Sequence, residues 1–225
     1  MFIVSEIGIP EGLTLRNPLR TELGRKIIST SIDLIDESGF EAFTFKKLAV
    51  KMGSNETSLY RYFENKHLLL LYLVVWYWNW VSYLIDYNSK NISDPVKKLN
   101  IILDIFIDAS QENPTIEFVN EAKLHNIIIS ESSKAYHTKD VDAENKNGFF
   151  LSYKSLIKKV ADVITEIDPK FPYPHSFASN LFEMANNQIF FADHLPRLTD
   201  IKIKKHNYGE VKELLEFYVA RMLNL

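Results

Sequence analysis

Apolar side chains recur at intervals of three and four residues along almost the whole 225-residue chain, and strand-like alternation is scarce. This spacing gives an α-helix one buried face. Only seven glycines are present, and no two lie close enough to form a phosphate-binding loop. A dinucleotide-binding fingerprint and a P-loop are thereby excluded. The sequence predicts an all-α fold.

Prolines divide the helical pattern into segments. Pro95 and Pro114 each follow a helix-capping side chain, Asp94 and Asn113 respectively, which is a helix-start signature. The run FPYP at residues 171–174 breaks the pattern again. We expect a polar loop over residues 132–148 and about nine helices, over residues 20–38, 45–52, 56–62, 66–88, 95–112, 114–134, 147–167, 175–193 and 208–224.

The composition, 46% apolar and 24% charged residues, is that of a soluble globular protein. The absence of cysteine excludes a disulfide framework, a zinc–thiolate site and a cysteine nucleophile, and it fits a reducing compartment. The first fifteen residues lack the basic and apolar regions of a secretory signal. We therefore expect a cytoplasmic protein with a flexible N-terminal arm over residues 1–17.

Residues 68–85, LLLLYLVVWYWNWVSYLI, form a segment about as long as a membrane-spanning helix. Its tyrosines and tryptophans lie in mid-segment, whereas those of a spanning helix prefer the two membrane interfaces. Asn79 and Ser82 interrupt it, and no second span accompanies it. We interpret the segment as a helix buried on most sides and expect no membrane association.

The stretch GFEAFTFKKLAVKMGSNETSLYRYFENKHLLL, residues 39–70, contains two short helical patterns. Thr44 can cap the first helix, and Gly53 can end it because glycine takes a left-handed conformation at little cost. The inward face of this helix consists of Phe45, Leu48, Ala49 and Met52. These apolar residues are interpreted as core, with no contact to DNA.

Ser54 or Asn55 can cap the second helix, which buries Leu59 and Phe63 four residues apart. The side chains left outward are Thr57, Ser58, Tyr60, Arg61 and Tyr62. Two short helices joined by a tight glycine turn form a helix-turn-helix.

This stretch resembles the TetR family of bacterial transcriptional regulators. GFEAFTFKKLAVKMG is similar to the second helix of that family, and SLYRYFENKHLL to its recognition helix and the start of its fourth helix. The resemblance covers about residues 20–70, and the remainder resembles the family only in the number and length of its helices. It implies a helix-turn-helix DNA-binding domain over residues 18–66 and a helical ligand-binding and dimerisation domain over residues 67–225.

The resemblance also implies roles for residues of the helix-turn-helix. The side chains expected to bind phosphate oxygens are Thr44, Tyr60 and Lys66, together with backbone N–H groups at the start of the first of the two helices, and Lys46 is also expected to contact DNA. Base reading would fall to Glu56, Thr57, Ser58, Arg61 and Tyr62. Two alternatives stay open, since the tyrosines could be ordinary packing and Glu56 could simply stabilise the helix N-terminus. A recognition helix this short implies a homodimer that reads two half-sites of a near-palindromic operator.

Two apolar stripes run along the helix at 175–193, which is more than its own core requires. The resemblance assigns one stripe to a four-helix dimer interface with the last helix. The interface residues expected are Phe177, Leu181, Met184, Gln188, Phe191, Val211, Leu214, Leu215, Tyr218 and Met222. The alternative is that both stripes lie inside the monomer.

Aromatic residues of the middle helices could line a pocket for an apolar or amphipathic small molecule. The candidates, each of which could instead be plain core, are Trp76, Trp80, Phe106, Phe118, His125, Tyr153 and Phe182.

Enzymatic function is not expected. The six histidines lack metal-ligand spacing, no serine occupies a nucleophile elbow, and neither a metal nor another cofactor is predicted. The acid-rich segment 140–151 has Asn145 and Leu151 where a calcium loop needs glycine and glutamate. We predict a DNA-binding regulator, a repressor released by a small apolar or amphipathic ligand. The alternative is a small-molecule sensor or carrier with a vestigial DNA-binding domain.

Overall fold

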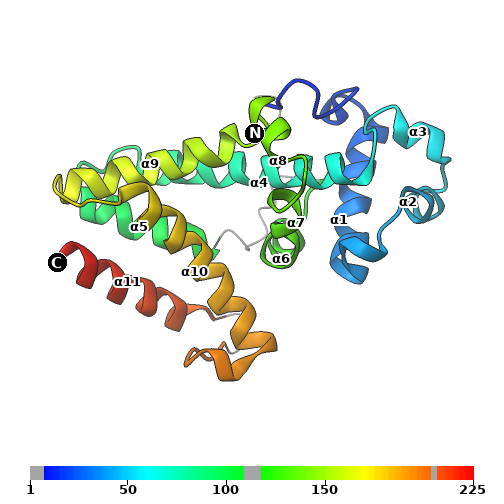
Figure 1. Ribbon diagram of the computed structural model, residues 1–225. Helices are drawn as coiled ribbons and strands as arrows, with labels where there is room; N and C mark the ends of the chain where they lie inside the picture. Colours follow the sequence, from blue (N-terminus) through cyan, green and yellow to red (C-terminus); the bar gives the residue numbers. More distant parts are fainter. Residues whose placement is uncertain (1–7, 109–117, 204–206) are drawn as a thin grey trace. The chain divides into compact units, whose positions relative to one another are not determined.

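The computed structural model describes residues 8–108, 118–203 and 207–225, which consist of helices and loops without a β-strand. The chain divides into two compact units. The first comprises Met1–Asn79 with Ser110–Ser152, and the second comprises Trp80–Ala109 with Tyr153–Leu225. The predicted all-α fold with an N-terminal helix-turn-helix domain is confirmed (Figure 1).

The first unit begins with a 3-10 turn, η2 (Pro18–Arg20). Its α-helices are α1 (Glu22–Ala42), α2 (Phe45–Met52), α3 (Glu56–Tyr60), the first part of α4 (Lys66–Ser89), α6 (Glu121–Glu131), α7 (Ser133–Tyr136) and α8 (Val141–Lys146). The second unit holds the remainder of α4, α5 (Pro95–Asp108), nearly all of α9 (Leu151–Ile167), α10 (Pro174–His194), the 3-10 turn η3 (Pro196–Leu198) and α11 (Gly209–Leu223).

The predicted helices differ from the observed ones mainly around the middle of the chain. The loop expected over 132–148 was wrong, because α7 and α8 lie within it and the buried Glu144 of α8 pairs with His67 at 2.7 Å. Helix α6 begins at Glu121, and the helix start expected at Asn113-Pro114 lies outside the described residues. The bounds expected for α2 are those observed.

Helix α1 has a kink where its last turn begins. Gly39 has φ 75° and ψ 159°, so the regular helix is interrupted there, close to the predicted end at residue 38. Before the kink, α1 buries the isoleucines Ile27, Ile28, Ile32 and Ile35. Each such side chain stabilises the fold by roughly 1.5–3 kcal/mol through removal of apolar area from water.

Helix α6 packs along α1, and polar pairs join the two helices. The Lys123 ammonium lies 2.5 Å from the Asp33 carboxylate, and the Asn126 amide donates to Asp36 at 3.2 Å. The bond to Asp33 raises the pKa of Lys123 above its usual value. Both pairs are in part accessible to solvent, so their contribution to stability is small, and they fix the register of α6 on α1 instead.

The segment before α1 contacts the rest of its unit at Leu13, Leu15 and Pro18. Leu13 is fully buried, and the N–H of Leu15 donates to the carbonyl oxygen of Tyr62 at 2.9 Å. Pro18 is also buried. The arm expected to be flexible over residues 1–17 is therefore in contact with its unit at Leu13 and Leu15, and its first seven residues lie outside the described part of the chain.

Helix α4 is long and apolar enough to cross a membrane by length and composition alone. However, 72% of its most apolar window is buried inside the protein. This burial favours the interpretation of α4 as a core helix, since a core helix passes the same hydropathy test.

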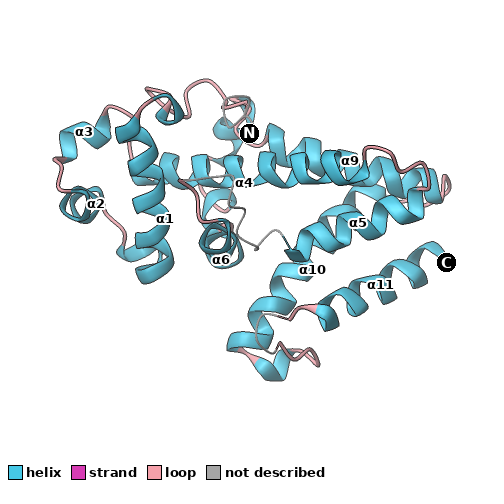
Figure 2. Ribbon diagram, turned by 180° about the vertical axis from the view of Figure 1, so that it is seen from behind, coloured by secondary structure: helices cyan, strands magenta, loops and turns pink. Residues whose placement is uncertain are grey.

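In the second unit, α5, α10 and α11 lie beside one another (Figure 2). Phe106 of α5 and Phe182 of α10 are buried, with ring centroids 5.2 Å apart in an edge-to-face contact. Helix α11 adds the buried residues Val211 and Leu215. These contacts form the core of this unit.

Candidate nucleic-acid interface

The first helix of the helix-turn-helix begins and ends as its sequence predicts. The Thr44 hydroxyl accepts a hydrogen bond from the N–H of Lys47 at 3.2 Å and caps α2. Gly53 follows the helix with φ 65° and ψ 36°, the left-handed conformation that glycine tolerates best. Its N–H bonds to carbonyl groups of the last turn. The tight turn therefore depends on this glycine.

The second helix, α3, is capped by Asn55, whose side chain accepts from the N–H of Ser58 at 2.9 Å. Leu59 and Phe63 are fully buried, as their four-residue spacing predicts. The helix ends at Tyr60, two residues before the predicted end. Hence α3 is a short helix held by two apolar side chains, and its other face is free to contact a partner.

The exposed face of this motif consists of polar and aromatic side chains. Thr57 and Arg61 are exposed, and Glu56 and Ser58 are half-buried. Tyr60 is 47% exposed, and its ring packs edge-on against Phe45 of α2 at 5.0 Å between centroids. Contact with Phe45 thus fixes the position of the Tyr60 ring, which carries the hydroxyl.

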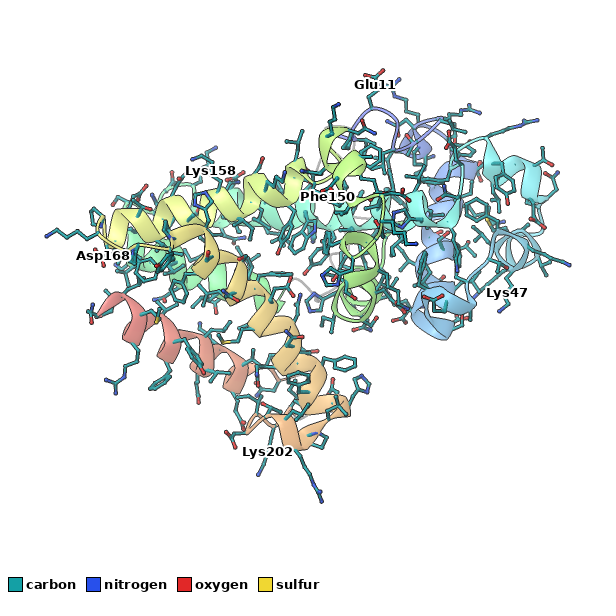
Figure 3. All side chains as sticks on the ribbon, viewed as in Figure 1. Glu11, Lys47, Phe150, Lys158, Asp168 and Lys202 are labelled. Carbon is teal, nitrogen blue, oxygen red and sulfur yellow. The ribbon has the colours of Figure 1, made fainter. Side chains whose placement is uncertain are left out.

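Helix α2 contributes further groups to the exposed surface of the motif. Thr44 and Lys46 are exposed, as is Lys47, which Figure 3 labels on α2. The Lys47 ammonium donates to the carbonyl oxygen of Ala42 at 2.7 Å, which ties it to the end of α1. Lys46 is thus the exposed α2 lysine best suited to a phosphate contact.

Tyr62 does not have the outward position that its sequence predicts. It is only 1% exposed, and its hydroxyl lies 2.7 Å from the Thr21 hydroxyl, which also caps α1. The prediction was wrong because the helical spacing ends at Tyr60, and the following turn directs Tyr62 inward. Tyr62 is a structural residue, and it cannot read bases from this position.

The hydrogen bonds of Lys66 do not fit its predicted role as a phosphate ligand. Its ammonium donates to the carbonyl oxygens of Phe40, Glu41 and Phe43 at 3.0, 3.3 and 3.2 Å. It lies 4.6 Å from the centroid of the Phe40 ring. A lysine ammonium has three N–H donors, so these bonds engage all of them. Lys66 therefore caps the C-terminal end of α1 and has no donor left for DNA.

Phe40, Glu41 and Phe43 lie where α1 ends and α2 begins, and the C-terminal end of α6 contacts this α1–α2 junction as well. The buried carboxylate of Glu131 accepts a hydrogen bond from the N–H of Phe40 at 3.0 Å. Lys134 pairs with Glu131 at 2.7 Å and with Glu41 at 3.3 Å, and the bond to Glu131 raises the pKa of Lys134. The sequence carries no signal for this contact, since 91 residues separate its partners. We name the bonds made by Lys66 and Glu131 to this junction the hinge clamp.

The predicted dimer stripe divides into buried and accessible residues. Four of its residues are buried in the second unit, namely Phe177, Leu181, Val211 and Leu215. For these four, the prediction of an interface role was wrong. Their side chains fill the core between α5, α10 and α11. The accessible ones are half-buried Met184, Gln188, Phe191 and Leu214, together with exposed Tyr218 and Met222. Phe217, which the sequence reasoning missed, is 56% exposed beside them.

The predicted pocket residues are distributed over both units. In the first, Trp76 and His125 are buried and Phe118 is half-buried. The Nδ1 atom of His125 lies 2.8 Å from the Tyr77 hydroxyl, and burial lowers the pKa of His125 to about 4. His125 is therefore neutral near pH 7 and fits an uncharged environment.

In the second unit, Trp80 is buried, and the rings of Tyr153 and Phe106 contact Phe182. The Tyr153 hydroxyl donates to Glu183 at 3.4 Å. Burial, together with Glu183, raises the pKa of Tyr153. Burial accounts for Trp80, Phe106 and Phe182 as core, whereas Tyr153 is half-buried.

A separate cavity of about 520 Å³ lies in the second unit between the end of α4, α5 and α9. Its wall combines isoleucines with lysines and acids that pair with each other, such as Lys159 with Asp86 at 2.6 Å. None of the seven predicted pocket residues lines it.

Comparison with known proteins agrees with the helix-turn-helix geometry. Residues 27–73 match the model of the bacterial regulatory proteins of the tetR family, a segment that includes α2, α3 and the hinge clamp residue Lys66. No curated protein shows significant sequence similarity to the chain.

Solved structures share the fold over most of both chains. AibR in complex with isovaleryl coenzyme A and operator DNA has a TM-score of 0.57 and 15% identity, covering 88% of this chain and 97% of its own. The fatty acid degradation regulator FadR from Bacillus halodurans has a TM-score of 0.56 and 16% identity, covering 88% and 93%. A protein from Mesorhizobium loti assigned to the TetR-family transcriptional regulators has a TM-score of 0.53 and 15% identity, covering 93% and 98%.

The family match coincides with the helix-turn-helix, and the fold of the remaining helices is shared with solved regulators of that type. The chain thus contains a segment, residues 27–73, that matches the tetR family of bacterial regulatory proteins, within a fold that it shares with solved TetR-type regulators.

Proposed function

We propose that the protein is a cytoplasmic, sequence-specific DNA-binding transcriptional regulator that binds a near-palindromic operator as a homodimer. The observation that carries the proposal is the division of α3 into two faces. Leu59 anchors the helix in the core, while Thr57 and Arg61 are exposed on the other side. A short helix with this division fits the major groove of B-DNA.

The exposed residues suit two kinds of DNA contact. Thr44, Lys46 and Tyr60 present a hydroxyl or an ammonium group to phosphate oxygens. Arg61 can donate two hydrogen bonds to a guanine edge, and Thr57 can contact a thymine methyl group. Glu56 and Ser58, half-buried at the start of α3, complete the proposed reading surface.

Dimerisation would use α10 and α11 of the second unit. Tyr218 and Met222 of α11 are 41% and 47% exposed, and they lie four residues apart on one face with half-buried Leu214. An exposed apolar stripe of this kind is suited to a symmetric helix–helix interface. Two copies of the short α3 would then read two half-sites.

We propose that a small apolar or amphipathic ligand releases the protein from DNA, so that the protein acts as a repressor. Support for a small-molecule ligand comes from a structural neighbour, AibR, whose structure holds both isovaleryl coenzyme A and operator DNA.

Selection of binding sites from random duplex DNA, followed by titration of the selected duplex, tests this function. We expect a near-palindromic site whose affinity falls steeply with salt concentration. An Arg61→Ala variant should discriminate less between base pairs at one position of each half-site. A wrong base pair at that position should then reduce the binding free energy by less than the usual ~1–3 kcal/mol. Arg197→Ala, which removes an exposed arginine of the second unit, is the matched control. Ligand binding without any sequence-preferring DNA binding would favour the sensor or carrier instead.

A further inference from the structure

The segment that precedes α1 lies against the C-terminal end of the recognition helix. The N–H of Leu15 donates to the carbonyl oxygen of Tyr62 at 2.9 Å, and the Thr21 hydroxyl lies 2.7 Å from the Tyr62 hydroxyl. Tyr62 directly follows Arg61, the proposed base reader. The segment before α1 is thus fixed beside the DNA-reading surface at two points.

Arg16 lies between these two points, and its side chain contacts Tyr62. The guanidinium carbon is 5.5 Å from the centroid of the Tyr62 ring, while the arginine is exposed to solvent. Within residues 8–108, 118–203 and 207–225, no carboxylate forms an ion pair with Arg16. Its positive charge is therefore held at a defined place, and no carboxylate of the described residues neutralises it.

The chemistry of this contact leaves the guanidinium able to bind an anion. Contact with an aromatic face attracts the cation without using its N–H donors. Those donors form a planar fork that matches two oxygens of a phosphate group. Because the side chain is already placed by the ring, less conformational entropy is lost when an anion binds than for a freely moving arginine.

We propose that Arg16 is a further DNA contact, which binds a backbone phosphate next to the groove that α3 occupies, and that Tyr62 is its positioning residue. This inference rests on the proposed DNA-binding function. It also gives buried Tyr62 an indirect role in DNA binding through the ring face that it presents to Arg16. The partner is the sugar–phosphate backbone, so the interaction is independent of base sequence.

The test measures affinity for the selected operator duplex and for an unrelated duplex across a range of salt concentrations. Arg16→Ala removes one phosphate-binding side chain from each subunit of a dimer, so the slope of log K against log salt should decrease by about 2. Both duplexes should be bound more weakly by a similar factor. Arg16→Lys should keep most of the wild-type slope because it keeps the charge, and Tyr62→Phe should do so because it keeps the ring.

Separate outcomes would overturn the inference and the proposed function. An unchanged slope in Arg16→Ala, with a lower midpoint of thermal unfolding, would show that Arg16 only fastens the segment, and the proposed function would stand. Weaker binding confined to one base sequence would overturn the assignment to phosphate. If the wild-type protein binds no duplex, both the proposed function and this inference fail. Circular dichroism establishes that each variant is folded, and Arg197→Ala is the control for removal of an exposed arginine.

Discussion

Replacing Lys66 with methionine should destabilise the protein and leave the salt dependence of DNA binding unchanged. The substitution keeps an unbranched apolar side chain but removes the ammonium that donates to three carbonyl oxygens at the α1–α2 junction. It also removes the cation from its place 4.6 Å from the centroid of the Phe40 ring. The hinge clamp would then depend on Glu131 alone.

The size of the effect follows from these interactions. Hydrogen bonds to charged groups contribute ~1.5–3 kcal/mol each in favourable cases, and an accessible cation–π interaction contributes ~0.5–1 kcal/mol. Three bonds that share one half-buried ammonium contribute less than three separate ones, because water can reach the carbonyl groups after the substitution. We expect a decrease of ~2–3 kcal/mol in the free energy of unfolding, measured by urea titration. The corresponding drop in the thermal midpoint is about 5–10 °C for a chain of this length.

Lys46→Met is the matched control, because Lys46 is exposed on α2 and is proposed to bind phosphate. It should leave the urea midpoint unchanged and reduce the slope of log K against log salt by about 2 for a dimer. Lys66→Met should instead lower the urea midpoint and leave the slope of log K against log salt unchanged. A Lys66→Met protein as stable as the wild type, with the reduced slope, would refute the reasoning from the hinge clamp and restore the phosphate role of Lys66.

Three other measurements test the rest of the structure. Burial lowers the pKa of His125 from its ordinary 6.5 to about 4, so the unfolded chain takes up this proton at a higher pH than the folded chain does. The free energy of unfolding should therefore fall by ~3 kcal/mol as pH decreases through that window, and His125→Gln should lose less over the same range. Gly24→Ala should cost ~1–3 kcal/mol in urea unfolding, because an added Cβ would collide with the backbone of Pro18. Met222→Glu should produce monomers in light scattering, whereas Leu198→Glu, at a leucine 61% exposed in η3, should not, and a dimeric Met222→Glu protein would refute the proposed interface.

Within single helices, the sequence predicted the structure well, because side-chain orientation follows the helical repeat. Leu59 and Phe63 are buried as their spacing requires, and Thr44 and Gly53 delimit α2 as their capping chemistry requires. These features depend on neighbours four residues away or fewer. The family resemblance added the expected arrangement of the helices and the site on α3.

Predictions at the ends of helices fared worse. Tyr62 and Lys66 lie just beyond the end of α3 and at the start of α4, where the chain changes direction and the helical repeat no longer determines which way a side chain points. The partners that fix them are the Thr21 hydroxyl for Tyr62 and three carbonyl groups between Phe40 and Phe43 for Lys66, and they are 23 to 41 residues away in sequence. Glu131 reaches the same junction across 91 residues. Such interactions depend on tertiary packing, which periodicity does not encode.

The dimer stripe shows the same limit in another form. A helix with two apolar stripes must bury both, but its periodicity does not distinguish a stripe buried in the monomer from one buried by a second copy. Leu215 and Tyr218 are three residues apart on α11, yet one is fully buried and the other is 41% exposed. The difference is set by α5 and α10, which cover one side of α11. The exposed side of α11 is therefore the side available to a second copy of the chain. Met222→Glu tests this side without disturbing the monomer core.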